Sequence, residues 1–231
     1  MARVLSMPFE IRYAKATDLS ALVSVEIRCF HASNYMRSTY KGCDPSAVHT
    51  FKTVSSIEYF ARSDCHILAG VNSESGDIIA YSRWKIPAIY ELERAVDTSL
   101  SNDAQWQMQN KWAYAPNLNK GTYTLYEEMI KSSRNTHLKE TDIVLELLCV
   151  LPEYQGIGIG SAFLRWGIEK ADASNARIFL EATVEGVPVY LKYGWKVVEE
   201  IQLDYTDRGG EGSQKFALMV REPACVTETG V

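Results

Sequence analysis

The chain has 231 residues, of which 46% are apolar and 23% are charged. This length and composition suit one globular domain with a full hydrophobic core, and no apolar run reaches the roughly 20 residues that a membrane-spanning helix needs. The net charge of −5 and the absence of any lysine- or arginine-rich run argue against a nucleic-acid partner.

Cysteine usage argues against both a disulfide framework and a metal site. The five cysteines are scattered, none forms a Cys-x-x-Cys pair, and the chain has four histidines. We therefore expect no metal, and we expect a reducing compartment, the cytoplasm, with no membrane association. The sequence leaves the oligomeric state open between a monomer and a homodimer.

The first third of the chain predicts a strand, a helical region and a hairpin. Residues 9–13 have the pattern of a strand, and Asp18 is an N-cap residue for a following helix with apolar residues at helical spacing. Residues 31–62 combine helices with loops. Residues 66–71 and 78–85 predict two strands, which the turn residues between them join into a hairpin.

The middle of the chain predicts a long insertion before the central strand. Residues 86 to about 141 form this insertion. Its polar centre, residues 99–110, is expected to be mobile, and residues 121–132 are expected to form a helix. Residues 143–151 are expected to be the central strand because all but one of them are apolar.

The last third of the chain alternates strands and helices. Residues 177–182 predict a short buried strand, residues 183–193 a helix, and residues 195–204 a further strand. Residues 214–220 are expected to form the final strand. The segment 223–231 is expected to be a flexible tail.

The order of these elements predicts an α/β (α+β) fold in one domain over residues 1–231. A mixed, largely antiparallel twisted sheet is expected at its centre, with helices on its faces. The insertion is expected to be helical and to lie between the third and fourth strands.

The segment from Leu147 to Ser161 carries the most chemical information. An apolar strand runs into a turn with glycines at alternate positions, Gly156, Gly158 and Gly160, and a helix follows at once. Because these glycines have no Cβ, backbone N–H groups can converge on an anion, and the N-terminus of the next helix adds its positive end. The segment therefore suits the pyrophosphate of a large cofactor.

Three kinds of phosphate loop compete for this segment. A P-loop ends in Gly-Lys-Ser/Thr, whereas Gly160 is followed by Ser161 and Ala162. The dinucleotide fingerprint Gly-x-Gly-x-x-Gly opens a βαβ unit, whereas this Gly-x-Gly-x-Gly lies about two-thirds of the way along the chain. The third kind is Gln-x-x-Gly-x-Gly, which matches the run from Gln155 to Gly160. A tight turn that binds no ligand is the remaining alternative.

The Gln-x-x-Gly-x-Gly run resembles the acetyl-CoA loop of the GNAT N-acetyltransferase superfamily. The lead-in Pro152–Gln155 resembles that family as well, and the run Val189–Trp195 is similar to its Leu-Tyr-x-x-x-Gly-Phe ending. The resemblance covers about residues 142–205. The sequence motif Leu-Glu-Ala-Thr-x-x-Gly, which begins at Leu180, resembles the fungal branch of the superfamily, so a fungal-type member is expected.

The resemblance implies that acetyl-CoA is the cofactor and that most of its contacts are with the main chain. Leu148, Cys149 and Val150 are expected to offer backbone groups to the pantetheine arm, as a paired strand would. Thr183 is also expected to touch the pantetheine, although relatives often carry Asn or Ser at this place. The residues expected around the pyrophosphate are Gln155, Gly156, Ile157, Gly158, Ile159, Gly160 and Ser161.

Glu146 is the candidate general base. It is the only charged residue in the run Ile143–Leu151, and strict strand alternation puts it on one face with Leu148 and Val150. Many relatives place an acidic residue nine positions before the glutamine of the loop. The alternative is a strand glutamate that is solvated or paired with an arginine, and Glu181 on the neighbouring strand is the rival acidic residue.

Tyr190 is the candidate general acid. It stands four residues before Gly194, where the resemblance places the helix tyrosine that faces the sulfur of CoA. Ordinary aromatic packing is the alternative, and Tyr193 is expected to be a packing residue.

These features predict an acetyl-CoA-dependent N-acetyltransferase that moves an acetyl group to a primary amine of a small molecule by direct attack. One alternative acceptor is an amine of a protein or peptide. A different class of function is a GNAT-fold protein that binds an acyl-CoA as a sensor or catalyses another reaction. Aromatic residues are expected either to select the acceptor or to belong to the core: Tyr35, Tyr40, Trp84, Tyr90, Trp106, Trp112 and Tyr114.

Overall fold

The computed structural model describes residues 8–92 and 100–224 of the chain. Seven strands within these residues form one sheet. In the sheet the strands follow the order β1-β2-β3-β4-β5-β7-β6, and only β4 and β5 pair in parallel. Their bounds are Phe9–Tyr13 (β1), Cys65–Asn72 (β2), Ile78–Lys85 (β3), Ile143–Val150 (β4), Ile178–Thr183 (β5), Lys196–Asp204 (β6) and Ser213–Arg221 (β7). The expected mixed, largely antiparallel sheet is confirmed.

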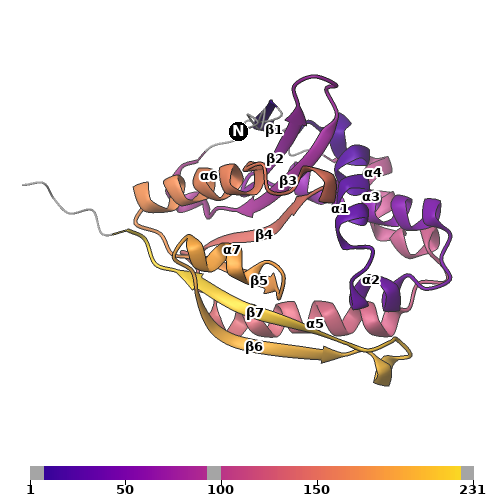
Figure 1. The fold of residues 1–231 in the computed structure, drawn as a ribbon. Coiled ribbons are helices and arrows are strands. Elements are labelled where there is room, and N and C mark those ends of the chain that lie inside the picture. The colour runs from indigo at the N-terminus through magenta and orange to yellow at the C-terminus, as the bar shows by residue number, and fades with distance from the viewer. Residues whose placement is uncertain (1–7, 93–99, 225–231) are drawn as a thin grey trace, which may run out of the picture.

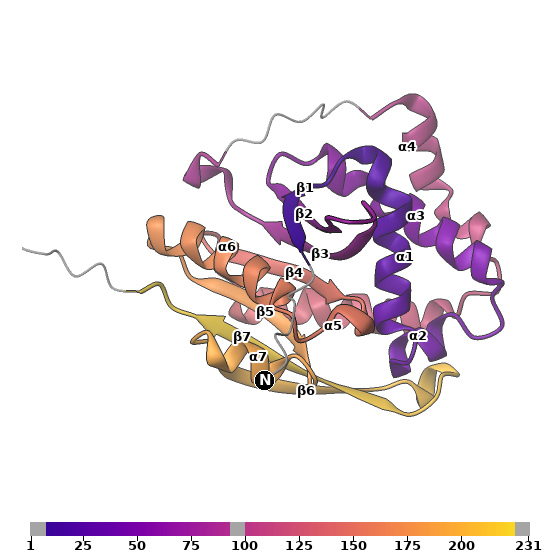
Figure 2. The same cartoon turned by 45° about the horizontal axis from the view of Figure 1, so that its top comes forward.

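Helices gather on two sides of this sheet. Figures 1 and 2 both place α1 to α4 on one side of the molecule and α6 and α7 on the other. The bounds are Leu19–Phe30 (α1), Asn34–Thr39 (α2), Pro45–Ala61 (α3), Asn102–Gln109 (α4), Lys120–His137 (α5), Ile159–Ala173 (α6) and Val187–Lys192 (α7). A short 3-10 helix, η3 (Lys111–Tyr114), joins α4 to α5, so the expected helical insertion between β3 and β4 is confirmed.

Helix α6 lies very close to the sheet. A Cβ added to Gly167 of α6 would lie 2.2 Å from the ring of Trp84, which is fully buried on β3. On β2, a Cβ at Gly70 would lie 3.3 Å from both Ile159 and Phe163 of α6. The two glycines therefore let the helix backbone and the strand approach to a distance that larger residues prevent.

Helix α5 covers the half of the sheet that contains β7 and β6. Met129 of α5 packs with Leu203, Tyr205 and Phe216 in one buried cluster. The apolar stripe of α5 also includes Tyr126, which partly buries its ring in the same cluster. The burial of this stripe fixes the side of α5 that faces the strands.

The sheet divides between its two parallel strands. β4 and β5 pair with each other only over Ile143–Leu145 and Ile178–Leu180, and beyond these residues the two strands no longer pair with one another. On the other side of β4, Arg83 is opposite Leu147 and Trp84 is opposite Leu145, so the ladder skips Glu146. A β-bulge of this kind adds one residue to a strand and redirects its side chain.

Two predicted elements differ from the structure. Residues 99–110 were expected to be mobile, but α4 begins at Asn102, where the Ser101 hydroxyl accepts a hydrogen bond from the N–H of Ala104 at 3.1 Å. The helix expected over residues 183–193 is too long because β5 continues to Thr183 and Pro188 lies in the first turn of the short α7.

The predicted helix caps and ends were partly right. Asp18 precedes α1, but its side chain makes no cap hydrogen bond and instead accepts from Arg12 and from the N–H of Lys15. The helix expected at residues 121–132 continues to His137 as α5. Most of the expected tail, residues 225–231, lies outside the described residues.

Candidate active site

The glycine turn after β4 presents an open surface. Gly156 and Gly158 have φ angles of 80° and 98°, in the left-handed region that favours glycine. A Cβ added to either residue would meet no atom within 4 Å, and one added to Gly160 would meet only Val150, at 3.9 Å. The space above the turn is therefore available to a ligand.

Backbone donors line this open surface. Within the described part of the chain, the N–H groups of residues 156–161 make no hydrogen bond. Ile159, Gly160 and Ser161 form the first turn of α6, where N–H groups lack intrahelical acceptors. Free amides together with a helix N-terminus form a site for an anion, so the residues present fit a pyrophosphate.

The turn is tied to the strand by its glutamine. The Nε2 group of Gln155 donates a hydrogen bond of 3.0 Å to the carbonyl oxygen of Val150, the last residue of β4. Its amide is therefore engaged with the protein, and it holds the turn close to the strand end.

Cys149 is buried. Its burial, and to a smaller extent its hydrogen bond with Cys29, raises the pKa of the thiol well above the usual value. Only the main chain of Cys149 is suited to contact a ligand.

A cavity of about 350 Å³ lies where β4 and β5 part. We call it the acceptor cavity. Its walls come from α1, α2, α3, η3 and α5 on one side and from the strands and α7 on the other. Four of the residues predicted from the sequence contribute to its lining: Glu146, Leu148, Thr183 and Tyr190. The rival acid Glu181 lines it as well, whereas residues 155–161 do not.

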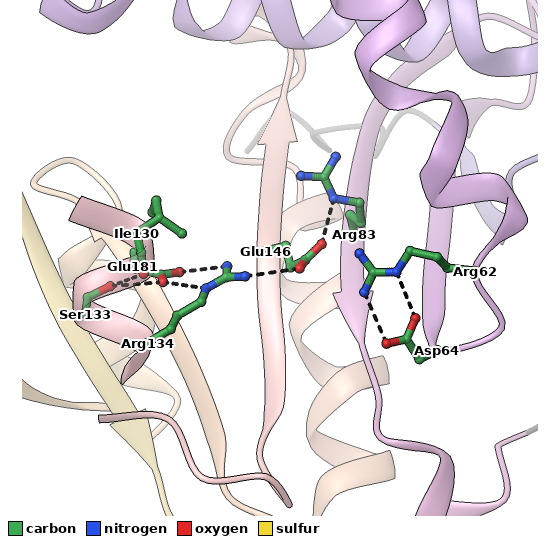
Figure 3. A network of polar contacts seen from close by, with 8 residues as sticks. All are labelled: Arg62, Asp64, Arg83, Ile130, Ser133, Arg134, Glu146 and Glu181. Atoms are coloured by element: carbon green, nitrogen blue, oxygen red, sulfur yellow. Dashed lines mark hydrogen bonds and ion pairs between the residues drawn. The ribbon is translucent and has the colours of Figure 1, made fainter. Parts of the chain in front are cut away.

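A chain of alternating charges crosses the wall of the acceptor cavity (Figure 3). Nε of Arg83 lies 3.0 Å from Oε2 of Glu146, and NH1 of Arg134 lies 3.3 Å from Oε1 of the same carboxylate. Arg134 also donates from Nε to Oε1 of Glu181 at 2.9 Å. The side chains of Glu146 and Glu181 are only 7% and 5% exposed. Glu146 thus pairs with arginines, as the structural alternative predicted, and it also faces the cavity, while its role as a base stays a prediction.

The two arginines keep their charge in this buried setting. Burial disfavours a charged guanidinium, but Tyr59 and Glu146 outweigh it and raise the pKa of Arg83 above its usual value. Burial also disfavours the charged form of Arg134, but the hydrogen bond to Glu181, followed by the charges of Glu181 and Glu146, raises the pKa of Arg134 above its usual value. The Arg83 guanidinium also stacks 3.7 Å from the centre of the Tyr59 ring.

The bulge changes the expected position of Glu146. Because the ladder skips this residue, strict alternation does not hold here, and Glu146 does not follow the pattern of Leu148 and Val150. Its carboxylate reaches Arg83, whose guanidinium lies against Tyr59 of α3. The bulge thus delivers the carboxylate to the acceptor cavity.

Tyr190 lies in the same cavity on α7. Its ring packs against Trp195 with 5.8 Å between the ring centres. Burial, followed by the nearby Cys149, raises the pKa of the Tyr190 hydroxyl above its usual value. The phenol therefore keeps its proton at neutral pH and is a weaker acid than a solvent-exposed tyrosine.

A second buried ion pair supports the floor of the acceptor cavity. Nζ of Lys52 lies 2.6 Å from Oε1 of Glu26, and the Tyr81 hydroxyl donates to Oε2 of Glu26 at 2.6 Å. Although burial opposes it, the attraction of Lys52 lowers the pKa of Glu26. The reciprocal attraction of Glu26 raises the pKa of Lys52 against the effect of burial.

The aromatic residues proposed for the acceptor side divide between the cavity and other places. Tyr35 and Tyr40 line the acceptor cavity, whereas Trp84 belongs to the core and Trp106 is 58% exposed. Sequence reasoning missed Lys52, Arg83 and Arg134, which are buried charges from other elements. It also gave no role to Tyr59, Tyr123 or Tyr126, which line the cavity.

The family comparison bears on residues 122–205, which match the family described as "Acetyltransferase (GNAT) domain". This segment contains β4, the glycine turn, α6, β5 and α7. Over these residues the sequence is similar to a GNAT acetyltransferase domain, which agrees with the expected class of N-acetyltransferase.

Solved structures agree with the GNAT fold. A protein of Corynebacterium glutamicum ATCC 13032, described as histone acetyltransferase HPA2 and related acetyltransferase, superposes with a TM-score of 0.61 at 19% identity, over 96% of this chain and 99% of that chain. A mosquito arylalkylamine N-acetyltransferase-like protein gives 0.54 at 15% identity, over 93% and 100%. A ribosomal-protein alanine N-acetyltransferase of Escherichia coli gives 0.51 at 15%, over 97% and 99%.

These identities establish a shared GNAT fold and nothing finer. Comparison with the sequences of curated proteins gives no match. Membership of the fungal branch therefore stays a prediction from the sequence motif that begins in β5.

None of the helices described has the length and apolar composition needed to cross a bilayer. No cluster of three or more His, Cys, Asp or Glu suited to a metal ion is found in residues 8–92 and 100–224.

Proposed function

We propose that this protein transfers an acetyl group from acetyl-CoA to a primary amine of a small molecule. The observation that carries the proposal is the row of unbonded N–H groups at residues 156–161, beneath open space at the end of β4. This row suits the pyrophosphate of coenzyme A. The unpaired edge of β4 beyond Leu145 suits the pantetheine arm, through the main chain of Leu148, Cys149 and Val150.

Acetyl-CoA supplies an acetyl thioester, and we assign the proton transfers to two residues of the acceptor cavity. Glu146 takes a proton from the attacking amine, directly or through a water molecule. The lone pair of the nitrogen forms the new C–N bond as the C–S bond breaks. Tyr190 gives a proton to the departing sulfur, which accounts for both protons. Thr183 and Leu148 line the same cavity.

A small acceptor is favoured over a protein by the form of the site. The volume of about 350 Å³ lies within the range of small-molecule pockets. Walls from both the first helices and the insertion surround it, whereas a protein acceptor calls for an open groove. The description of the mosquito neighbour as arylalkylamine N-acetyltransferase-like is compatible with a small amine, and that of the Escherichia coli neighbour keeps a protein acceptor as the alternative.

The first test measures cofactor binding. Acetyl-CoA is expected to raise the melting temperature of the protein, and Gly158→Glu is expected to abolish this rise because a carboxylate would occupy the anion site. Gly76→Glu is the matched control, since Gly76 also has a positive φ, of 78°, and open space around it, but lies in the β2–β3 turn. An equal rise in wild type and Gly158→Glu would refute the loop assignment.

The second test measures turnover. Release of free thiol from acetyl-CoA is followed with a panel of small primary amines and with lysine peptides. Turnover of small amines supports the proposal, and turnover of peptides alone supports the protein alternative. Binding of acetyl-CoA without release for any amine would support a sensor or a different reaction instead.

A further inference from the structure

The rim of the acceptor cavity carries two carboxylates without an ion-pair partner. Among the described residues, the deeper carboxylates are paired: Glu26 with Lys52, and Glu146 and Glu181 with Arg134. Glu58 of α3 and Glu127 of α5 also line the cavity, but both are exposed and neither makes an ion pair within residues 8–92 and 100–224. Lys111 of η3 also lines the cavity and makes no ion pair among the described residues, so the unpaired lining charges are two carboxylates and one ammonium group, a net negative charge that a cationic ligand can answer.

The two rim carboxylates lie around the same tyrosines. After burial, Glu127 is the next largest cause that raises the pKa of Tyr123, and Glu58 contributes as well. Both carboxylates also act on Tyr59, which lines the same cavity. Glu58 of α3 and Glu127 of α5 thus line the same cavity as the rings of Tyr59 and Tyr123.

The chain itself shows that rings at this wall hold an alkylammonium group. Nζ of Lys111 lies 5.9 Å from the ring centre of Phe51, 5.5 Å from that of Trp112 and 5.6 Å from that of Tyr123. It also donates a hydrogen bond of 3.5 Å to the Tyr123 hydroxyl. Ring faces attract cations within about 6 Å of their centres, so this wall is built for positive charge.

We propose that the acceptor is an aliphatic diamine or polyamine, whose remote ammonium group lies between Glu58 and Glu127 at the rings of Tyr59 and Tyr123. The inference rests on the proposed function. The reacting nitrogen at the other end of the molecule reaches Glu146 and Tyr190, and the transfer step is unchanged. The remote ammonium group keeps its proton throughout.

An aromatic monoamine fits these observations less well. Its ring would pack on the tyrosines, but it would bring no second charge to the rim. Lys111 would then be the one unpaired cation in the described lining beside the two rim carboxylates, and the net negative charge would stay unanswered. A second ammonium group answers both the carboxylates and the rings.

The test compares matched amines on the whole 231-residue chain. Thiol release from acetyl-CoA is measured with 1,5-diaminopentane, n-pentylamine and 2-phenylethylamine, so that the first two differ only in the second amine. The kcat/KM for the diamine is expected to be about tenfold higher than for n-pentylamine, which corresponds to one partly exposed ion pair together with one cation–π contact. Because the rim is exposed, this preference is expected to fall as salt is added.

Charge-removing variants locate the effect. In the double variant Glu58→Gln with Glu127→Gln, the preference is expected to fall to less than about threefold, through a higher KM for the diamine with little change in its kcat. Glu128→Gln is the matched control, because Glu128 is an exposed glutamate on the same helix that does not line the cavity. This control is expected to keep the preference.

The outcomes separate the inference from the proposed function. Equal rates for diamine and monoamine, a preference for 2-phenylethylamine, or a diamine preference that survives in the double variant would overturn the inference, while acetyl transfer itself stands. No thiol release with any amine would overturn the proposed function, and the diamine inference with it.

Discussion

The glycine turn and the acceptor cavity are built by opposite means. The turn uses main-chain amides from consecutive residues, 156–161, and needs little from its side chains beyond the missing Cβ of its three glycines. The acceptor cavity uses charged and aromatic side chains from five α-helices, one 3-10 helix and four strands, spread from Glu26 to Phe216. A site made of backbone is encoded locally, whereas a site made of side chains depends on the whole fold. The two should therefore respond differently to substitution.

The largest expected effect is on the buried ion pair below the acceptor cavity. Glu26→Gln leaves the Lys52 ammonium without its partner, and the side chains of Glu26 and Lys52 are only 15% and 12% exposed. The free energy of unfolding in urea is expected to fall by about 3–5 kcal/mol at pH 7. Glu153→Gln, which removes an exposed partner of Arg28 beside the glycine turn, is expected to leave stability unchanged.

The same pair gives a pH dependence with a defined sign. Because the folded protein lowers the pKa of Glu26, this group stabilises the fold fully above the unfolded value of 4.5 and loses that effect as the pH falls through the folded pKa. Between pH 7 and acid pH, wild type is therefore expected to lose more stability than Glu26→Gln. Parallel acid titrations of the two proteins would contradict this assignment.

The next effect concerns the arginine that joins the two parting strands. Arg134→Met leaves Glu146 and Glu181 without their shared cation, and since Arg134 is 25% exposed we expect a loss of about 2–4 kcal/mol. The control Arg62→Met breaks the pair with Asp64, which is 29% exposed, and is expected to cost less than about 1 kcal/mol. Urea unfolding of both variants measures the difference. Equal losses would show that the cavity network has no special weight.

A smaller effect tests chemistry within the cavity. Tyr190→Phe removes the proposed proton donor and is expected to lower kcat about 100-fold, with the KM for acetyl-CoA near that of wild type. Tyr193→Phe, one turn away on the same segment, is the control and is expected to keep full activity. Unchanged turnover in Tyr190→Phe would leave this tyrosine a packing role only.

The smallest effect is expected when a side chain of the glycine turn is shortened and its backbone is kept. Ser161→Ala keeps the backbone N–H and removes only a hydroxyl, so the affinity for acetyl-CoA, measured by calorimetry, is expected to change by less than about threefold. A large loss of affinity would mean that side chains of the turn hold the cofactor, and the contrast between the two regions would weaken.

This contrast also explains how far the sequence was informative. The strands, the helical insertion and the glycine turn follow from local patterns, and the structure confirms the strands to within a few residues. Arg134 left no such signal, because an arginine on an amphipathic helix is usually solvated and its partners lie 12 and 47 residues away. The bulge at Glu146 was hidden for the same reason, since it depends on register with β3.

Other misses had local signals that were outweighed. Ser101 caps α4 in a segment whose polar composition favoured a mobile loop. Pro188 marks the true start of α7, but the apolar and aromatic residues on both sides favoured a longer helix. Lysine burial was the hardest feature to foresee, because Lys52 is buried only through its pairing with Glu26, from a different helix.

The close fit between Gly167 and Trp84 has a consequence for the anion site. No additional carbon atom fits between Gly167 of α6 and Trp84 of β3. The tilt of α6 is therefore fixed at the middle of the helix, well away from its first turn. The same contact sets the height of the free amides above the sheet. A methyl group added at Gly167 would push α6 away from the sheet and move the row of N–H donors outward. The affinity for a bound phosphate can therefore be altered without changing any residue that contacts the phosphate.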